Sequence, residues 1–400
     1  MAPSAPRRHC MVVLNSYPEG EVRVMREAEV LVRHGYEVDV ICLRLPGQPA
    51  RDEYHRVRIC RVPMARSLKR VAAVQFIEYL AFFVLAGVTL TYLHFQRRYT
   101  SVQVHNLPDF LVFCALVPKL MGVPVVLDLH DLMPEFYAAR FGVDNRHWMA
   151  RLVRLQEKLA CRFADHVITV TEHWRQSLNL RHLPAGKCTV LMNLADDQIF
   201  NAPKPLGAPP NGAAPEGLRL IYHGALFERY GLDLVVEAVD RLRREIPGLH
   251  LTIIGRGPFR DDLAKMVADR GLQAHVALEP FVMIDQLPAR IIAADLAVVP
   301  YRDDVFTREL LPTKLLEYAA LGVPALVAET PAIRAHFDDT MVKFFTPGSA
   351  EQLADKLQEL HYDRAQLHRL SAGIRKFNER YNWRQQSLAY VQLLEKLTSR

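Results

Sequence analysis

The chain has 400 residues and half of them are apolar, which is enough for two hydrophobic cores of ordinary size. The net charge of +6 belongs to the first 98 residues, which hold 15 Lys and Arg against 9 Asp and Glu, so we expect this quarter of the chain to meet an anionic surface. The six cysteines form no Cys-x-x-Cys pair and stand in apolar surroundings, and no apolar run of signal-peptide type follows the basic start, which predicts reduced, buried thiols in a cytosolic protein.

Short β-branched runs alternate with helical patterns through the first half of the chain, as in repeated βαβ units. The strand runs are almost continuously apolar, which is typical of a parallel sheet covered by helices on both faces. Strands are predicted over residues 9–15, 36–42, 101–105, 124–129, 166–170 and 189–192. Helices are predicted over residues 22–34, 109–121 and 146–163.

The segment 71–95 is apolar, and no charged residue occurs from Tyr79 to Gln96. Its length permits a membrane span, but a span would place the two halves of one sheet on opposite sides of the bilayer, so we do not expect one. Either the helix is buried against the sheet, or it lies in a membrane interface with its aromatic-rich face and with flanking cations on anionic headgroups. We favour the interface, because a helix that is apolar all round exceeds what covering one sheet face requires. The flanking cations are Arg66, Lys69, Arg70, Arg97 and Arg98.

Residues 201–217 carry five prolines and no apolar periodicity, the composition of an interdomain linker. We therefore expect an N-terminal domain over 1–200, a C-terminal domain over 218–375 and a last helix, within 376–400, that crosses back to the first domain. The second domain repeats the alternation of strands and helices. Its strands are predicted over 218–222, 249–254, 275–278, 296–300, 325–328 and 342–345, and its helices over 231–246, 259–269, 285–293 and 313–321.

Two glutamates, Glu309 and Glu317, stand with seven residues between them on either side of a predicted helix start. Pro312 is tolerated in a first helical turn because its missing N–H would be unpaired there, and Gly322 is a typical helix stop. The helix over 313–321 therefore has one glutamate on the loop before it and the other one turn inside it.

The start of that helix combines unpaired backbone amides, the positive end of a helix dipole and the cation of Lys314. A bound phosphate would satisfy all three, and two carboxylates that reach one ligand from different sides indicate a nucleotide sugar. The alternative is a capped surface helix on which Glu309, Lys314 and Glu317 are simply solvated. The position after the predicted strand 296–300 favours a ligand, because ligands of doubly wound sheets bind beyond the carboxyl ends of the strands.

Several segments together resemble the retaining glycosyltransferases of the two-domain GT-B fold known as family 4. The resemblance covers essentially the whole chain and implies an α/β fold of two doubly wound, Rossmann-like domains that face each other across a cleft. Besides the Glu-x7-Glu pair, it rests on Tyr222-His-Gly-Ala-Leu-Phe-Glu-Arg-Tyr-Gly-Leu-Asp, Ile254-Gly-Arg-Gly-Pro258, Ala294-Asp-Leu-Ala-Val-Val-Pro300 and Val126-Leu-Asp-Leu-His-Asp-Leu-Met-Pro-Glu135.

The resemblance implies roles for the residues around the helix start. Glu309 would contact hydroxyls of the donor sugar near the anomeric carbon, and Glu317 would contact the ribose hydroxyls. The amides of Leu311 and Thr313 would face the diphosphate, whereas Pro312 between them has no N–H to donate.

The chain departs from the family pattern where many relatives have Gly-Arg-Leu followed by Lys-Gly. Here the residues are Gly224-Ala225-Leu226 and Tyr230-Gly231, so Arg229 and Lys314 are the expected cations for the leaving group. Gly255 belongs to a Gly-x-Gly turn without the third glycine of a dinucleotide fingerprint, which predicts a loop near the nucleotide base rather than an NAD site.

His130 follows a predicted strand and resembles the family's interdomain histidine, which contacts the donor sugar or the acceptor, so it joins Glu309 as a catalytic candidate. Asp131 and Glu135 in the same segment, and His105 after another strand, are candidates for acceptor recognition. The alternatives are loop capping for the two carboxylates and a structural role for the histidines.

We expect a retaining hexosyltransferase that uses a nucleotide diphosphate sugar, a UDP-sugar in first place and a GDP-sugar as the alternative. The acceptor would be a lipid-linked saccharide or a lipid at the inner face of the cell membrane, as in polysaccharide or glycolipid biosynthesis. Neither a metal nor another cofactor is expected if protein cations balance the leaving group, and nucleic acid is not expected because the aromatics do not interleave with the arginines. A non-catalytic nucleotide-sugar-binding scaffold and a soluble enzyme with a small acceptor remain as alternatives.

Overall fold

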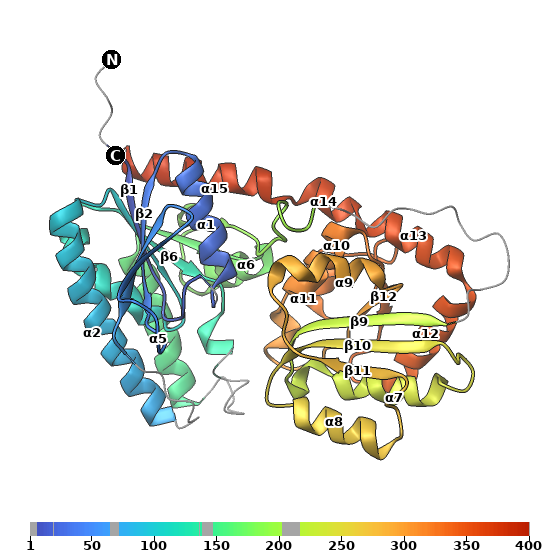
Figure 1. Cartoon of the computed structure of the whole chain (residues 1–400). Coiled ribbons are helices and arrows are strands. Elements are labelled where there is room, and N and C mark those ends of the chain that lie inside the picture. The colour runs from blue at the N-terminus through green and yellow to red at the C-terminus, as the bar shows by residue number, and fades with distance from the viewer. Residues whose placement is uncertain are drawn as a thin grey trace. The chain divides into compact units, whose positions relative to one another are not determined.

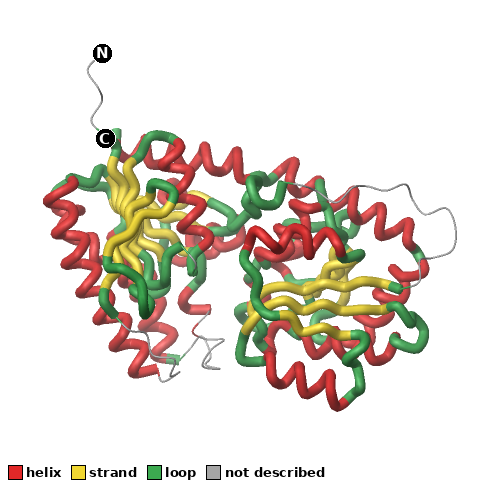
Figure 2. Tube along the Cα trace, viewed as in Figure 1, coloured by secondary structure: helices red, strands yellow, loops and turns green. Residues whose placement is uncertain are grey.

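The chain forms two compact units, which are called unit 1 and unit 2 below. Unit 1 comprises Met1–Asn193 with Gln385–Arg400, and unit 2 comprises Leu194–Arg384. Each unit holds one β-sheet between helices (Figures 1 and 2). The predicted linker 201–217 starts just after the change of unit, and most of it lies outside the described residues. The computed structural model describes residues 6–18, 20–64, 72–135, 137, 147–201 and 217–399.

Unit 1 contains an eight-stranded sheet with the order β3-β4-β2-β1-β5-β6-β7-β8. The strands pair in parallel except for β3, which runs antiparallel to β4. This edge hairpin was not predicted: β3 is polar apart from Tyr54, whereas β4 carries an apolar alternation that was overlooked. The strands are β1 (Arg8–Val12), β2 (Glu37–Leu43), β3 (Arg51–Tyr54), β4 (Val57–Val62), β5 (Ser101–His105), β6 (Val125–Leu129), β7 (His166–Thr169) and β8 (Cys188–Val190).

Helices cover both faces of this sheet, with α2 and α5 on one side and α1 and α15 on the other (Figure 1). The predicted helix over 109–121 is split into the 3-10 helix η1 and the short helix α3, in which Pro118 lacks a backbone donor. The helices are α1 (Val22–Arg33), α2 (Ala72–Arg97), η1 (Asp109–Ala115), α3 (Leu116–Leu120), α5 (Trp148–Phe163), α6 (Glu172–Arg181), η2 (Ala185–Lys187) and α15 (Trp383–Thr398), which enters unit 1 at Gln385.

Helix α2 has two apolar faces, and the fold buries one of them. Phe82, Ala86 and Leu90 lie in the core of unit 1, whereas Val88 is 66% exposed and Phe95 is 63% exposed. The helix therefore both packs against the sheet and exposes an apolar face, and the membrane contact of that face stays a prediction. By length and composition alone, the segment Val74–Arg97 is also apolar enough to cross a membrane. The exposed apolar residues are Phe76, Ile77, Leu80, Val84, Leu85, Val88, Tyr92 and Phe95.

Unit 2 contains a parallel six-stranded sheet with the order β11-β10-β9-β12-β13-β14, and all six predicted strands are present. The strands are β9 (Leu218–Ala225), β10 (Leu249–Arg256), β11 (Val276–Glu279), β12 (Leu296–Val299), β13 (Ala325–Ala328) and β14 (Lys343–Phe345). The helices are η3 (Glu228–Tyr230), α7 (Leu232–Leu242), α8 (Arg260–Asp269), η4 (Ile284–Gln286), α9 (Leu287–Ala293), η5 (Thr307–Glu309), α10 (Thr313–Leu321), α11 (Pro331–Arg334), α12 (Ala350–Tyr362), α13 (Arg364–Ile374) and α14 (Lys376–Arg380).

The helix predicted over 313–321 is α10, with the bounds expected from its sequence signals. Pro312 precedes its first residue, and Gly322 closes it in the left-handed conformation with φ of 65°. The two parallel-sheet α/β units are likewise those that the alternation of strands and helices predicts. All six cysteines are free, and Cys60 alone among them is not fully buried.

Two glycines of unit 2 share a left-handed backbone and differ in their surroundings, which permits a matched test. Gly231 has φ of 66°, and a Cβ there would lie 2.0 Å from the carbonyl oxygen of Pro300; Gly271 has φ of 64° and no neighbour within 4 Å. We predict that Gly271→Ala lowers the free energy of unfolding by about 1 kcal/mol from backbone strain. Gly231→Ala should cost about 3 kcal/mol or more, because the backbone must also move. Urea unfolding measures both, and equal losses would contradict the close approach.

Candidate functional site

The loop that carries Glu309 is fixed in place at the carboxyl end of β12. The carboxylate of Asp304 accepts hydrogen bonds from the amides of Phe306 at 2.8 Å and Thr307 at 2.7 Å. Thr307 is buried, and its hydroxyl donates to the carbonyl oxygen of Arg302. Glu309 ends η5, is partly exposed and lies four residues before α10 begins. Its carboxylate is therefore presented from a loop whose backbone is tied down.

Glu317, one turn inside α10, is held by a buried histidine at the end of β9. Its Oε2 lies 3.0 Å from Nε2 of His223. The His223 ring packs edge-on against Tyr318, with ring centroids 5.2 Å apart, and its amide donates to the Tyr318 hydroxyl at 3.4 Å. Neither His223 nor Tyr318 was singled out from the sequence, although His223 lies in the quoted Tyr222 segment. The Glu317 side chain is therefore oriented toward His223.

Arg229, Gly224 and Gly255 come together at the same sheet edge. The Arg229 guanidinium lies 5.5 Å from the ring centroid of Phe306, beside the segment that carries Glu309. Gly255 must be a glycine, because a Cβ there would lie 1.9 Å from the carbonyl oxygen of Gly224. The ends of β9 and β10 therefore approach each other closely and leave backbone rather than side chains at this edge.

Lys314 lies elsewhere than the sequence suggested. It was expected to contact the diphosphate, but its side chain is 6% exposed and its Nζ donates to the hydroxyl of Tyr301 at 2.8 Å. Burial lowers the pKa of Lys314 to about 8, although the charge of Glu317 opposes this shift. The predicted direct contact between this ammonium and a phosphate is therefore not supported. The start of α10 still offers the backbone amides of its first turn, beginning at Thr313, with Leu311 buried before it.

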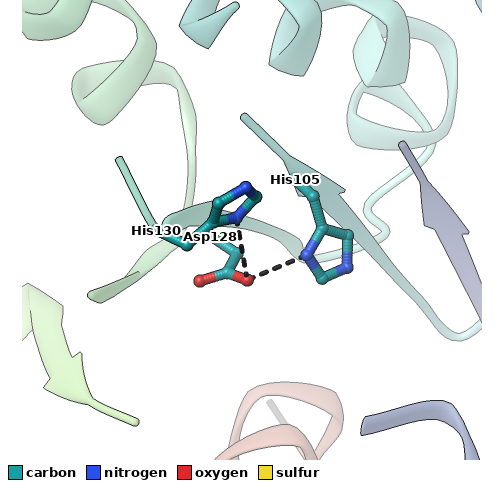
Figure 3. Close-up of side chains that lie close together, drawn as sticks. All are labelled: His105, Asp128 and His130. Carbon is teal, nitrogen blue, oxygen red and sulfur yellow. Dashed lines mark hydrogen bonds and ion pairs between the residues drawn. The ribbon is translucent and has the colours of Figure 1, made fainter. Parts of the chain in front are cut away.

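Unit 1 has a second group of polar side chains, centred on the buried carboxylate of Asp128 (Figure 3). His105 places Nδ1 2.8 Å from Oδ2 of Asp128, and His130 places Nδ1 3.7 Å from the same oxygen. Arg23 from α1 binds both oxygens, with Nε at 2.7 Å and the terminal nitrogen at 2.9 Å. One carboxylate thus faces three nitrogen-bearing side chains.

The network continues away from Asp128 to the C-terminal helix. Nε of Arg23 lies 3.2 Å from Glu27, whose other oxygen accepts from the Gln103 amide at 2.7 Å. The amide oxygen of Gln103 accepts from the hydroxyl of Tyr390 on α15 at 2.7 Å. A chain of buried contacts therefore links α15 to the residues at the end of β6.

The ligand atoms of His105, Asp128 and His130 lie within 4.8 Å of one another, close enough to raise the question of a metal ion. The bidentate guanidinium of Arg23 already occupies both oxygens of Asp128. A divalent cation would have to displace that ion pair or lie beside its positive charge. The cluster fits an internal ion-pair network better than a metal centre.

The same network sets the charge of His130. Burial opposes protonation of this imidazole, but the nearby Asp128 carboxylate, 3.7 Å from Nδ1, outweighs burial and raises the His130 pKa to about 9. Conversely, Arg23 and the two histidines hold the pKa of Asp128 well below its usual range against the effect of burial. His130 is therefore an imidazolium at neutral pH, and its side chain keeps 16% of its exposure.

Asn106 orients the backbone that follows β6. Its side-chain oxygen accepts from the amides of His130 at 3.1 Å and Asp131 at 3.3 Å, and its amide nitrogen donates to the carbonyl oxygen of Asp131 at 2.5 Å. Burial raises the pKa of Asp131 to about 6. Neither Asn106 nor this clamp was predicted.

Two of the residues predicted to contact the acceptor, Glu135 and His105, bind other side chains of unit 1. Glu135 pairs with Arg181, its Oε1 lying 3.1 Å from the guanidinium. His105 is fully buried and bonded to Asp128, so it supports His130 rather than reaching a ligand from its present position. Asp128 and Arg23 were missed, yet a charged residue inside the apolar run of β6 is a signal that the sequence does carry.

Two family models match the chain in succession. The model described as "Glycosyl transferase 4-like domain" matches residues 20–193, and the model described as "Glycosyl transferases group 1" matches residues 208–377. Together they account for the greater part of both units.

Curated relatives include a GDP-mannose-dependent alpha-(1-6)-phosphatidylinositol monomannoside mannosyltransferase of Mycobacterium tuberculosis, which is 31% identical over 41% of this chain and 43% of its own length. This chain therefore spans less than half of that relative. A 2-deoxystreptamine glucosyltransferase of Streptomyces kanamyceticus is 25% identical over 78% of this chain and 79% of its own length.

Among solved structures, a sucrose-phosphate synthase from Thermosynechococcus elongatus aligns with a TM-score of 0.77 at 18% identity, covering 98% of this chain and 99% of that one. Anabaena Alr3699/HepE in complex with UDP-glucose aligns with a TM-score of 0.71 at 14% identity, covering 97% and 99%. These similarities establish the fold. With both family models matched and both sheets in place, the chain belongs to the group 1 glycosyltransferases of the GT-B fold.

Proposed function

We propose that this glycosyltransferase is a retaining enzyme that moves a sugar from a nucleotide diphosphate donor to a hydroxyl of a lipid-linked saccharide or a lipid. The observation that carries the donor assignment is the placement of Glu309 and Glu317 on either side of the start of α10, at the strand-end edge of unit 2. A UDP-sugar is the first choice and a GDP-sugar the second. HepE was solved with UDP-glucose, and the mycobacterial relative is named as GDP-mannose-dependent.

The chemistry of the transfer fits this arrangement. Cleavage of the anomeric C–O bond passes through an oxocarbenium-like state and releases an anionic diphosphate. The carboxylate of Glu309 would stabilise positive charge on the sugar, while the amides at the start of α10 and the guanidinium of Arg229 would bind the diphosphate. In a front-side displacement, the departing phosphate oxygen takes the proton of the acceptor hydroxyl, so no side chain has to act as the base.

His130 is proposed to act as a cation. With a pKa near 9 it is protonated at neutral pH, so it would donate hydrogen bonds to sugar or phosphate oxygens rather than accept a proton from the acceptor. Asp131, the next residue, is partly exposed and is proposed to contact the acceptor.

A membrane surface is proposed as the place of action. The exposed apolar face of α2 is joined by α5, which exposes Trp148, Leu152, Leu155 and Leu159. Both helices pack on η1, through Phe83 on Phe110 and Phe163 on Phe113. Both helices lie on one side of the sheet (Figure 1), and apolar side chains exposed on that side suit the interfacial region of a bilayer. The relative named as acting on 2-deoxystreptamine keeps a small acceptor as the second candidate.

Of the predicted flanking cations, Arg98 is exposed and follows α2 directly. Arg97 is engaged by Glu37 at 2.6 Å and Asp39 at 3.0 Å, and Arg66, Lys69 and Arg70 lie outside the described residues. Helix α5 supplies others, because Arg151, Lys158 and Arg162 are exposed among its exposed leucines, whereas its glutamate, Glu157, is buried. The proposed site of action is the inner face of the cell membrane.

Donor hydrolysis tests the catalytic proposal. We predict slow release of free sugar from UDP-glucose or GDP-mannose, and a loss of about 100-fold or more in Glu309→Gln, because the carboxylate acts on charge that develops in the transition state. Glu317→Gln should mainly weaken donor binding. The control is Glu351→Gln, an exposed glutamate in the first turn of α12, which should keep the wild-type rate. Chromatography of the released sugar measures all four proteins, and donor binding without hydrolysis or transfer would indicate a scaffold.

Removing the charge of Asp128 tests the state of His130. In Asp128→Asn, we predict that the His130 pKa falls well below about 9, because burial lowers it and only the weaker effects of the Glu21 and Asp131 charges still raise it. The high-pH limb of the transfer rate should shift in the same direction. NMR titration of the imidazole measures the pKa, with Asp165→Asn, an exposed carboxylate paired with Lys119, as control.

The single variant removes one of the two carboxylates that pair with the buried Arg23 guanidinium and leaves Glu27 at 3.2 Å, so it should cost up to about 3–5 kcal/mol of folding free energy. The double variant Arg23→Met with Asp128→Asn removes that charge and should recover part of the stability. An unchanged His130 pKa in either protein would refute the proposed origin of its charge.

Co-sedimentation with vesicles tests the membrane proposal. We predict binding at low salt to phosphatidylcholine vesicles that contain phosphatidylglycerol. Changing Arg151, Lys158 and Arg162 together to Gln should weaken it more than tenfold, at about 1 kcal/mol per cation. The control changes three exposed cations of unit 2, Arg241, Lys265 and Arg369, to Gln. Wild-type protein that stays in the supernatant at low salt would contradict the proposal.

A further inference from the structure

The side chain of Lys314 ends among three tyrosine rings, which come from three different segments of unit 2. Its Nζ lies 5.0 Å from the ring centroid of Tyr222, 5.2 Å from that of Tyr230 and 4.9 Å from that of Tyr301. Tyr230 and Tyr301 stack on each other with centroids 4.7 Å apart. The faces of aromatic rings carry negative charge density and attract an ammonium. The three rings, called the tyrosine box below, therefore form a cation site that is occupied from within the protein.

The box joins segments that all end at the donor edge of the sheet. Tyr222 belongs to β9, Tyr230 ends η3, and Tyr301 follows β12, while Lys314 itself comes from the first turn of α10. Gly224, near the end of β9, has φ of 123°, which favours glycine, and a Cβ there would lie 3.2 Å from Cε of Lys314. The lysine stem thus passes close to the backbone at the end of β9.

The ammonium is poorly compensated in the protein alone. Its hydrogen bond goes to the neutral hydroxyl of Tyr301, and the carboxylate whose charge acts on it, Glu317, is itself paired with His223. A buried cation without an ion-pair partner is unfavourable. An anion bound at the start of α10 would supply the missing negative charge.

We propose that Lys314 is a positioning residue of the donor site, which packs close to Gly224 and balances the charge of a bound diphosphate without touching it. This inference rests on the proposed nucleotide-sugar donor and assigns the cation that the altered Gly-Arg-Leu and Lys-Gly segments lack. The tyrosine box keeps the ammonium at one point, so its field is already in place when the donor binds.

The proposal makes donor affinity depend on pH. Burial lowers the Lys314 pKa to about 8, so the free protein loses this charge as the pH rises through that value. Burial raises the pKa of the Tyr222 and Tyr301 hydroxyls well above their usual range, so these phenols stay neutral. The other charged or titratable groups nearby are Glu317 and Tyr318 on α10, His223 on β9 and, on η3, Tyr230 and Arg229.

The test measures the dissociation constants of UDP and GDP by calorimetry between pH 7 and pH 9. For the wild type we expect affinity to fall as the pH rises through about 8. Lys314→Met fills the same space without a charge, so it should bind the preferred nucleotide at least tenfold more weakly at pH 7 and with less pH dependence. Ionisation of the nucleotide affects both proteins equally, so the ratio of their constants isolates Lys314. Lys265→Met, at an exposed lysine of α8, is the matched control and should behave as the wild type.

Thermal unfolding separates this role from a purely structural one. Because Lys314→Met removes a buried charge, its Tm at pH 7 should equal or exceed that of the wild type. Tyr301→Phe keeps the ring and loses the hydroxyl that holds the ammonium, and should also weaken nucleotide binding while it remains folded. Unchanged nucleotide binding in both variants would overturn the inference. Weaker binding in both variants together with a Tm lowered by several degrees would overturn it as well, because a structural role would then suffice. Neither result would contradict the proposed donor. Failure of the wild type to bind either nucleotide would overturn both proposals.

Discussion

The charge of Asp128 is the constraint on which the interior of unit 1 depends. Removing a carboxylate from water costs on the order of several kcal/mol, unless partner groups compensate its charge. Here Arg23 binds both oxygens and two histidines face one of them. Elements far apart in sequence must therefore meet at one point, because α1 brings the arginine and β5 brings His105 to the end of β6.

The buried charge of Asp128 also affects His130, which is partly exposed at the surface of unit 1. Arg23 alone would neutralise Asp128, yet the carboxylate also raises the pKa of His130 to about 9. The group that favours the charged form of this histidine is thus a carboxylate that solvent does not reach. Because Tyr390 reaches Gln103 and through it Glu27, the packing of α15 also bears on this network.

Unit 2 has the opposite arrangement at its own sheet edge. There the buried charge is positive, and aromatic faces rather than a carboxylate surround it. A carboxylate would neutralise the Lys314 ammonium fully, whereas tyrosine rings stabilise it in part and leave its field available to a ligand. The close contact between Glu317 and His223 serves the same end, because it directs that carboxylate toward the histidine.

The sequence predicted the elements well and their side-chain partners poorly, for a physical reason. Apolar periodicity, Pro312 and Gly322 are local signals, and they predicted the strands of unit 2 and both ends of α10. The partners of Lys314 and Asp128 come from segments tens of residues away, so no local pattern specifies them. The position of Glu309 was predictable because a loop after a parallel strand lies at the ligand edge wherever it occurs, but the direction of the Lys314 side chain was not.

Helix α2 has an apolar stripe that the packing of unit 1 does not require. Packing on the sheet requires one apolar stripe, which Phe82, Ala86 and Leu90 provide. The stripe on the other side, with Val84, Val88 and Phe95 exposed, adds nothing to that core and carries the entropic and solubility disadvantages of apolar surface in water. Polar residues would serve the fold equally well at those positions. That stripe is the observation behind the proposed membrane contact, in which a bilayer interface would receive both the apolar side chains of α2 and the exposed leucines and cations of α5.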